Sequence, residues 1–207
     1  VIFHLAALIS IPHSYLSYQS FVDTNVTGTM NILTSSKRNK IKKVFITSTS
    51  EVYGTGQKLP IKENHPLNPQ SPYAASKVAA DQLSISFYKS FGLPVTILRP
   101  FNTFGPRQSS RAVIPTIISQ VISGKKNIKI GNIKTSRDFT FIDDTVNAFV
   151  KALHAKKIEG EVINISSNNQ IYIKDIIRQI KNITSINFNI KLEKKRLRPK
   201  KSEVEVL

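Results

Sequence analysis

Short apolar runs alternate with amphipathic segments in the first half of the chain. Residues 1–7 form a continuous apolar run, and residues 42–48 and 94–99 have apolar centres of similar length. Runs this short, without polar residues at every second position, are typical of strands that are buried on both faces of a parallel sheet. The pattern therefore predicts three strands of one sheet.

The segments between these runs have helical spacing. From Ser17 onwards, apolar residues recur at intervals of four, four and three, at Val22, Val26, Met30 and Leu33. Ser71 can cap a second helix, Pro72 suits its first position and Gly92 can end it. That helix has an apolar residue at every fourth position, Ala75, Ala79, Leu83 and Phe87. Alternating strands and helices predict an α/β fold, a doubly wound parallel sheet with right-handed crossovers.

The second half of the chain has a looser pattern. Helices are expected over residues 113–123, 142–155 and 173–183, and strands over residues 128–130 and 161–165. We therefore divide the chain into residues 1–105, which form most of the sheet, and residues 106–207. The second part is expected to form mainly a smaller α/β lobe, interleaved with late elements of the first, that closes a ligand cleft.

The composition of the chain excludes several functional classes. The 207 residues include no Cys, which excludes a disulfide framework, and the four His lack metal-ligand spacing, so no metal site is expected. No run of eighteen apolar residues and no signal segment is found, which favours a cytoplasmic protein without a membrane partner. The net charge of +17 is spread along the chain. Because no nucleic-acid motif accompanies it, we expect no nucleic-acid partner, even at the basic cluster of residues 194–201.

Polar side chains follow the predicted strands where their carboxyl ends would meet a ligand. Small residues, Ala6 and Ala7, follow the first strand, and Pro100 and Asn102 follow the third. The second strand is followed by a polar stretch, Ser48, Thr49, Ser50 and Glu51. These three groups are expected to converge.

A Tyr and a Lys lie four residues apart at the start of the helix capped by Ser71. Tyr73 and Lys77 would project from the same helix face, where an ammonium group can favour a phenolate. Tyr73 is therefore a candidate base. Alone, the pair also fits an ordinary exposed helix surface.

Six ordered motifs resemble those of the extended short-chain dehydrogenases/reductases, from Val1 to about Arg198. They are His4-Leu5-Ala6-Ala7, Asn25-Val26-Thr27-Gly28-Thr29, Ser48-Thr49-Ser50-Glu51-Val52-Tyr53-Gly54, Tyr73-x-x-x-Lys77, Arg99-Pro100-Phe101-Asn102 and Gly105-Pro106-Arg107. That family contains NAD-dependent nucleotide-sugar epimerases, 4,6-dehydratases and decarboxylases. The resemblance implies a Rossmann-like sheet, NAD as cofactor, a nucleotide-sugar substrate and a homodimer.

The resemblance also implies residue roles. Tyr73 would take the proton of the sugar 4-hydroxyl, Lys77 would lower the pKa of Tyr73 and hold the cofactor ribose, and Thr49 or Ser48 would bind the same sugar oxygen. The implied cofactor contacts are Ala6, Ala7, Asn25, Ser48, Tyr73, Lys77 and Pro100. The implied substrate contacts are Ser50, Asn102, Arg111, Val113, Arg137 and Arg198, of which the last two Arg suit a diphosphate.

Glu51 bears on the choice among reactions. A carboxylate beside the catalytic Thr could remove the C5 proton after C4 oxidation, as in 4,6-dehydratases. Ser50 stands where dehydratases commonly have an Asp, and Thr-Ser-Glu also resembles UDP-glucuronate decarboxylases. The string from Phe101 to Pro115 is similar to dehydratases of N-acetylglucosamine nucleotides of the legionaminic-acid type. We therefore favour a dehydratase, with decarboxylase and 4-epimerase as alternatives.

A dinucleotide-binding sheet carries a Gly-rich turn after its first strand. No such turn occurs here, since Gly54-Thr55-Gly56 lacks the third glycine. We therefore expect a fragment that lacks the first strands and the C-terminal end and that binds NAD poorly by itself. A non-catalytic cationic scaffold is the alternative from another class.

Overall fold

The computed structural model describes residues 1–207 and has a four-stranded parallel sheet at its centre. The strands are β1 (Ile2–His4), β2 (Val44–Thr47), β3 (Val95–Pro100) and β7 (Val162–Ile165), in the order β1-β2-β3-β7. Every neighbouring pair in this sheet is parallel. The mixed α/β fold with a parallel sheet confirms the predicted fold class, and β7 joins the sheet from the second half of the chain.

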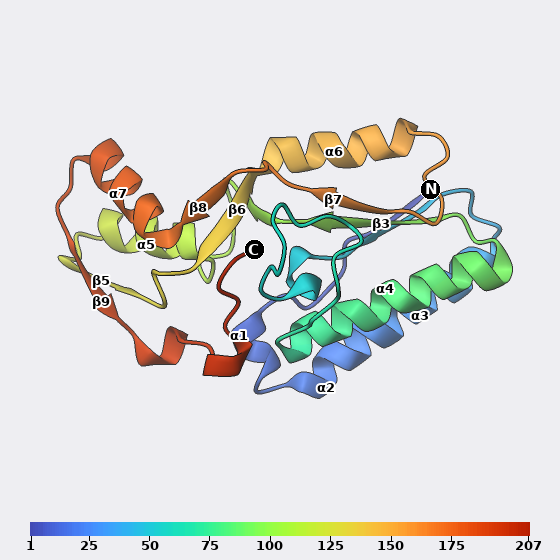
Figure 1. Cartoon of the computed structure of the whole chain (residues 1–207), viewed down its shortest axis with the longest axis horizontal. Coiled ribbons are helices and arrows are strands. Elements are labelled where there is room, and N and C mark those ends of the chain that lie inside the picture. Colours follow the sequence, from blue (N-terminus) through green and yellow to red (C-terminus); the bar gives the residue numbers. More distant parts are fainter.

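Helices cover both faces of the sheet (Figure 1). One face is covered by α3 (Gly28–Arg38) and α4 (Pro72–Phe91), which lie side by side, and the other by α6 (Ile142–His154). Successive residues of β2 point to opposite faces, so Val44 and Ile46 pack with Leu33 of α3, whereas Phe45 packs with Ala152 of α6. A sheet buried on both faces explains why its strands are apolar runs.

The segment before α3 differs from the predicted single helix. It contains α1 (Ile11–Ser14), α2 (Tyr18–Phe21) and a π-helical stretch, Val22–Thr27, that runs into α3. The wider π turn shifts the helical register. The buried face therefore carries Phe21, Asn25, Thr29 and Leu33, and Val22, predicted to be on that face, is 44% exposed.

Helix α4 begins and ends where the sequence predicts. Ser71 Oγ accepts a hydrogen bond from the Ala74 backbone N–H, Pro72 is the first helical residue, and Gly92 ends the helix in the left-handed conformation at φ 65°. Its most buried face, however, is polar, whereas Ala75 is exposed. That buried face includes Tyr73, Ser76, Lys77, Asp81 and Ser84.

The second lobe contains α5 (Val113–Ile122), α7 (Ile173–Thr184) and two small sheets. One sheet pairs β5 (Asn127–Ile130) with β9 (Asn189–Leu192), and the other has β6 (Ser136–Phe141) between β4 (Asn102–Phe104) and β8 (Gln170–Tyr172). Isoleucines of α5, α7 and β5 form its core. Helices were predicted at both places, whereas β4, β6, β8 and β9 were not predicted.

The last residues of the chain return to the first half, as Figure 1 shows for the C-terminus. After two 3₁₀ turns, Lys194–Arg196 and Lys200–Ser202, the backbone oxygen of Val206 accepts a hydrogen bond from Gly56 at 2.9 Å. Val204 and Leu207 are buried against Val52, Tyr53 and Phe101. No helix has the length and the apolar sequence that crossing a membrane would require.

Candidate active site

Thr49 and Tyr73 meet at the carboxyl end of β2. Thr49 precedes a 3₁₀ turn, Ser50–Tyr53, and its Oγ1 accepts a hydrogen bond from the Glu51 backbone N–H at 3.2 Å. Tyr73 lies in the first turn of α4 and is 6% exposed. Burial raises the pKa of the Tyr73 phenol, and Thr49, its side-chain partner, acts in the opposite direction. The two side chains are therefore placed to hold one ligand oxygen between them.

Burial dominates the ionisation of Tyr73. Desolvation raises the pKa of this phenol well above its ordinary value, and the negative charges of Glu51 and Asp81 raise it further. Lys77 does not contribute to the pKa of Tyr73. Its Nζ donates instead to the Thr47 backbone oxygen at 2.5 Å. The lowered pKa expected from the Tyr-Lys spacing is therefore not found in this structure.

Lys77 is itself a perturbed group. Burial lowers its pKa, and the carboxylate of Asp81, one turn further along α4, raises it. On the β1 side, burial and the charge of Lys77 lower the pKa of His4. His4 Nε2 lies 3.1 Å from Thr29 Oγ1, so the imidazole packs beneath the site and is held by α3.

Glu51 is paired with Arg198 across 147 positions of sequence. Arg198 Nη1 and Nη2 lie 3.1 and 3.2 Å from the two carboxylate oxygens, and the Arg198 and Glu51 side chains are 19% and 9% exposed. Burial opposes the charge of Arg198, but Glu51 and Glu203 outweigh it and raise the pKa of Arg198. This bidentate pair ties the C-terminal segment to the turn beside Tyr73.

Arg137 lies next to this pair. Burial lowers the pKa of Arg137, the charge of Glu51 raises it, and the charge of Arg198 lowers it again. Its Nη1 donates to the Ser136 backbone oxygen at 2.7 Å, and the residue is 6% exposed. The structure thus gathers Thr49, Glu51, Tyr73, Arg137 and Arg198, the last two from the second half of the chain.

Ser48 faces away from this group. Its Oγ donates to Asp81 Oδ2 at 2.9 Å, inside the protein. Neighbouring residues of an extended backbone point to opposite sides, so only Thr49 can face Tyr73. Asn25 is also fully engaged: its amide bonds the backbone N–H and oxygen of Leu8 and Ser76 Oγ. It holds the loop that follows β1.

The other predicted residues occupy more open positions. Beyond the end of β1, Ala6 is exposed and Ala7 is half-buried, and Pro100 ends β3 just before Asn102 begins β4. Arg111 is exposed in the loop before α5, and Val113 packs on the core of the second lobe. No hydrogen bond or ion pair joins Arg111 to Tyr73, Glu51 or Arg198.

Asp81 and Tyr53 were not predicted from the sequence as residues of the site. Asp81 is fully buried in an ion pair with Arg99, and Tyr53 Oη accepts a hydrogen bond from the same Arg99. The available signal was the spacing of Tyr73, Lys77 and Asp81, which places all three on one face of α4.

Several polar atoms of the site retain hydrogen-bonding capacity. Ser50 Oγ and Thr47 Oγ1 are buried without a partner, and Lys77 Nζ donates to a single backbone oxygen. The small side chain of Ala6 leaves the backbone after β1 accessible. These features fit a flat, polar cofactor such as NAD lying over the strand ends.

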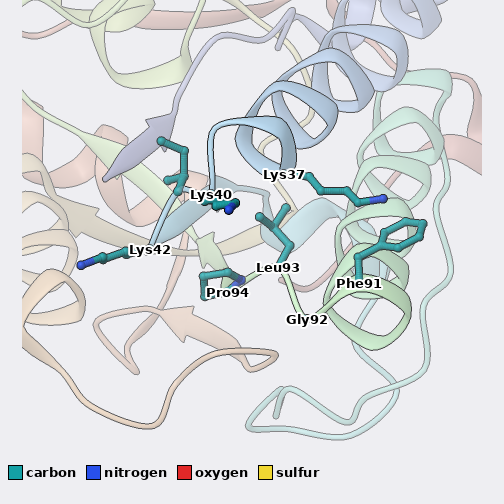
Figure 2. A pocket seen from close by; sticks show the side chains of 8 residues that line it. Lys37, Lys40, Lys42, Phe91, Gly92, Leu93 and Pro94 are labelled. Carbon is teal, nitrogen blue, oxygen red and sulfur yellow. The ribbon is translucent and has the colours of Figure 1, made fainter.

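A cavity also lies away from this site. It has a volume of about 440 Å³ and lies where α3 and α4 end, below the first residues of β2 and β3 (Figure 2). Lys37 and Phe91 face one another there, with Nζ 3.6 Å from the ring centroid, whereas Lys42 points away from them. Lys37 lies in the last turn of α3, where a positive charge complements the helix dipole.

The fold and the side-chain group define the class, an α/β enzyme with the Thr, Tyr and Lys arrangement of the extended short-chain dehydrogenases/reductases. The chain belongs to the family described as GDP-mannose 4,6 dehydratase, whose sequence model matches residues 1–206. It is 38% identical over 195 residues to a dTDP-D-glucose 4,6-dehydratase of Dictyostelium discoideum, covering 89% of this chain and 45% of that protein. It is 35% identical over 192 residues to a UDP-N-acetyl-alpha-D-glucosaminuronate decarboxylase of Bacillus cytotoxicus, covering 89% and 59%.

A solved structure agrees with these relatives. The UDP-glucuronic acid 4-epimerase of Bacillus cereus, in complex with UDP-glucuronic acid and NAD, superimposes with a TM-score of 0.90 at 33% identity. The match covers 98% of this chain and 63% of that one. The chain thus spans about half the length of the curated relatives it matches, 45% and 59% for the two described.

Proposed function

We propose that the gene product carrying this chain is an NAD-dependent nucleotide-sugar 4,6-dehydratase, acting on a UDP- or GDP-linked N-acetylglucosamine. The observation that carries this proposal is the meeting of Thr49, Tyr73 and Glu51 at the carboxyl end of β2. A proton acceptor for the sugar hydroxyl and a carboxylate for a neighbouring carbon are the two groups that dehydration requires. A scaffold has no use for this combination.

NAD would supply the acceptor for the C4 hydride and return it later in the cycle. Ala6 and Ala7 let the ring system approach the backbone, and Lys77 has two unused N–H donors for a ribose hydroxyl. Thr47 Oγ1 is a further unpartnered group at the same strand end. These residues bind and orient the cofactor.

Tyr73 takes the proton of the sugar 4-hydroxyl, and Thr49 Oγ1 orients that oxygen. Oxidation at C4 acidifies the C5 proton, which Glu51 removes as the C6 hydroxyl leaves as water. Positive charge brought to Tyr73 by a bound cofactor would offset the cost of ionising this buried phenol. Ser50 is a poorer acid than the Asp common in dehydratases, so we expect slow loss of water.

Arg137 and Arg198 bind the diphosphate, and Asn102 binds a diphosphate or sugar oxygen. Both Arg side chains are held in place, Arg137 by the Ser136 backbone and Arg198 by Glu51. Fixed guanidinium groups suit bidentate phosphate recognition. Arg111 and Val113, at the start of α5, contact the nucleotide from the second lobe.

The test is to incubate the gene product and NAD separately with UDP-N-acetylglucosamine, GDP-N-acetylglucosamine and UDP-glucuronate, and to identify products by mass spectrometry and NMR. The dehydratase gives a 4-keto-6-deoxy product and incorporates deuterium at C5 in D₂O, and Glu51→Gln abolishes both. Release of carbon dioxide from UDP-glucuronate identifies a decarboxylase instead. The absence of turnover on all three substrates refutes the proposal and leaves the scaffold.

A 4-epimerase is the second candidate, because both oxygens of Glu51 are engaged by Arg198. Epimerisation needs Tyr73 and Thr49 but no base at C5. An epimer of unchanged mass, formed without deuterium incorporation and equally well by Glu51→Gln, identifies this reaction.

The gene product is also proposed to be a homodimer that pairs through α4. Ala75, Ala79, Gln82 and Ser86 lie on one side of this helix at intervals of four, three and four and carry no charge. Small uncharged side chains allow close packing of helices. Light scattering should give twice the monomer mass, and Ala75→Arg should reduce it to the monomer.

A further inference from the structure

A buried polar network lies directly behind the candidate site. Asp81 is 0% exposed, and its Oδ2 accepts three hydrogen bonds, from Ser48 Oγ at 2.9 Å, Arg99 Nε at 3.1 Å and Arg99 Nη2 at 2.9 Å. The Arg99 and Asp81 side chains are 4% and 0% exposed. An ion pair so fully desolvated contributes little net stability, which suggests a role other than stability.

The network continues from Arg99 to the turn that carries Thr49 and Glu51. Arg99 Nη1 donates to Tyr53 Oη at 2.8 Å, and its guanidinium carbon lies 4.9 Å from the centre of the Tyr53 ring. Tyr53 Oη in turn donates to Asn164 Oδ1 of β7 at 2.7 Å. Tyr53 is the last residue of the 3₁₀ turn Ser50–Tyr53. The network therefore connects α4, β3, β7 and this turn.

One atom of the network is free. Asp81 Oδ1 is buried and has no hydrogen-bond partner. Asp81 lies one helical turn after Lys77, and the two charges interact. The other groups that face Lys77 are the Thr47 backbone oxygen of β2 and His4 of β1, whose pKa is lowered by burial and by Lys77. Asp81 is thus the carboxylate that faces this ammonium group.

We propose that Asp81, Arg99 and Tyr53 are positioning residues of this site. They hold the turn carrying Thr49 and Glu51 against the helix carrying Tyr73 and Lys77, and Asp81 places a carboxylate one helical turn from Lys77. The proposal deepens the proposed function and rests on it, since the positioned groups are those of its reaction. Its electrostatic arm is the effect of the Asp81 carboxylate on the charge of Lys77. Its positional arm is the hydrogen bonding of Tyr53, which holds the turn in place.

The electrostatic arm is tested with D81N/R99Q. Changing both partners avoids a single unpaired buried charge, which would destabilise the fold. Asp81 raises the pKa values of both Lys77 and Tyr73. Without the charge of Asp81, the limb of the kcat–pH profile that Lys77 sets should move to lower pH, and kcat should fall by about tenfold. The Lys77 ¹³Cε signal, assigned with Lys77→Arg, should titrate at lower pH.

The positional arm is tested with Tyr53→Phe, which removes the hydroxyl between Arg99 and Asn164. We expect kcat to fall without movement of the pH profile or of the Lys77 titration. Exchange of the Glu51 amide hydrogen, which bonds Thr49 Oγ1 at 3.2 Å, should become about tenfold faster because the turn opens more often. This exchange is measured by NMR and needs no turnover.

The matched control is D175N/R178Q, which makes the same chemical change at an exposed ion pair on α7 of 3.0 Å. It should leave the profile and the Lys77 titration unchanged. If D81N/R99Q does not fold, Ser48→Ala removes one hydrogen bond from the same carboxylate but keeps its charge, so the Lys77 titration should move to higher pH by a smaller amount.

An unchanged Lys77 titration in folded D81N/R99Q overturns the electrostatic arm, and an unchanged Glu51 amide exchange in Tyr53→Phe overturns the positional arm. The two readouts remain valid without an identified substrate. Failure of the proposed function, seen as absence of turnover on every nucleotide sugar, is therefore distinguishable from failure of this inference.

Discussion

Removing the ion pair between Glu51 and Arg198 should reveal how firmly the C-terminal segment is held against the site. The perturbation is a double-mutant cycle of Glu51→Gln, Arg198→Met and the combined variant. Two hydrogen bonds join the side chains, at 3.1 and 3.2 Å. Hydrogen bonds to charged groups contribute about 1.5–3 kcal/mol each, and desolvation of both charges offsets a large part of that.

Neighbouring charges further reduce the expected coupling free energy between Glu51 and Arg198. Arg137 lies beside Glu51, and Glu203 Oε1 lies 3.9 Å from Arg198 Nε, so each partner keeps a nearby opposite charge when the other is removed. We therefore expect a coupling free energy of about 2 kcal/mol, which corresponds to about 30-fold in the folding equilibrium. Because the side chains are 9% and 19% exposed, added salt should screen the pair weakly.

The assay is urea unfolding of the four proteins, followed by circular dichroism, in low salt and in 0.5 M NaCl, a concentration at which the screening length is only about 4 Å. The exposed pair Asp175–Arg178, whose charged atoms lie 3.0 Å apart, serves as a control and should show a coupling below about 0.5 kcal/mol. A Glu51–Arg198 coupling as small as that of the control, or one abolished by salt, would refute the reasoning from burial.

Three further outcomes are expected. In an alkaline titration followed at 295 nm, Tyr53 and Tyr73 should ionise only on unfolding, because burial raises both pKa values. The stability that these neutral phenols contribute to the fold is therefore present below about pH 10 and lost as pH rises. Tyr73→Phe should reduce this loss. Asn25→Ala removes three hydrogen bonds of a buried side chain and should cost about 2–3 kcal/mol in urea unfolding, against less than about 0.5 kcal/mol for Asn39→Ala at an exposed position. Gly54→Ala places a Cβ 2.2 Å from a backbone oxygen at φ +63° and should cost about 3 kcal/mol or more, so a melting temperature equal to that of the wild type would contradict the geometry.

The order of strands and helices around the site follows from local sequence. The apolar runs of residues 42–48 and 94–99 contain β2 and β3, and Ser71, Pro72 and Gly92 bound α4 as their local conformational preferences require. The carboxyl ends of parallel strands share one edge, so Thr49, Glu51 and Tyr73 could be placed together before any tertiary contact was known. Hydrophobic periodicity and helix capping depend on residues that are close together in sequence, so the sequence shows them directly.

Tertiary structure decided which side chains face the ligand and how they ionise. Ser48 and Thr49 are adjacent and both carry hydroxyl groups, but only packing against Asp81 determines that Ser48 points inward. The spacing of Tyr73 and Lys77 suggests a lowered pKa for the phenol, yet desolvation, which depends on every element around it, raises that pKa.

The long-range partners of these side chains likewise could not be predicted from the sequence. Arg198 reaches Glu51 only because the C-terminal segment returns across the first half of the chain, and Asp81 meets Arg99 only because α4 packs on β3. The π-helical stretch Val22–Thr27, which shifts the buried face of its helix, was not predicted either. Local sequence determined the elements and the chemistry they carry, whereas burial and contacts between distant segments determined the partner and the charge state of each group.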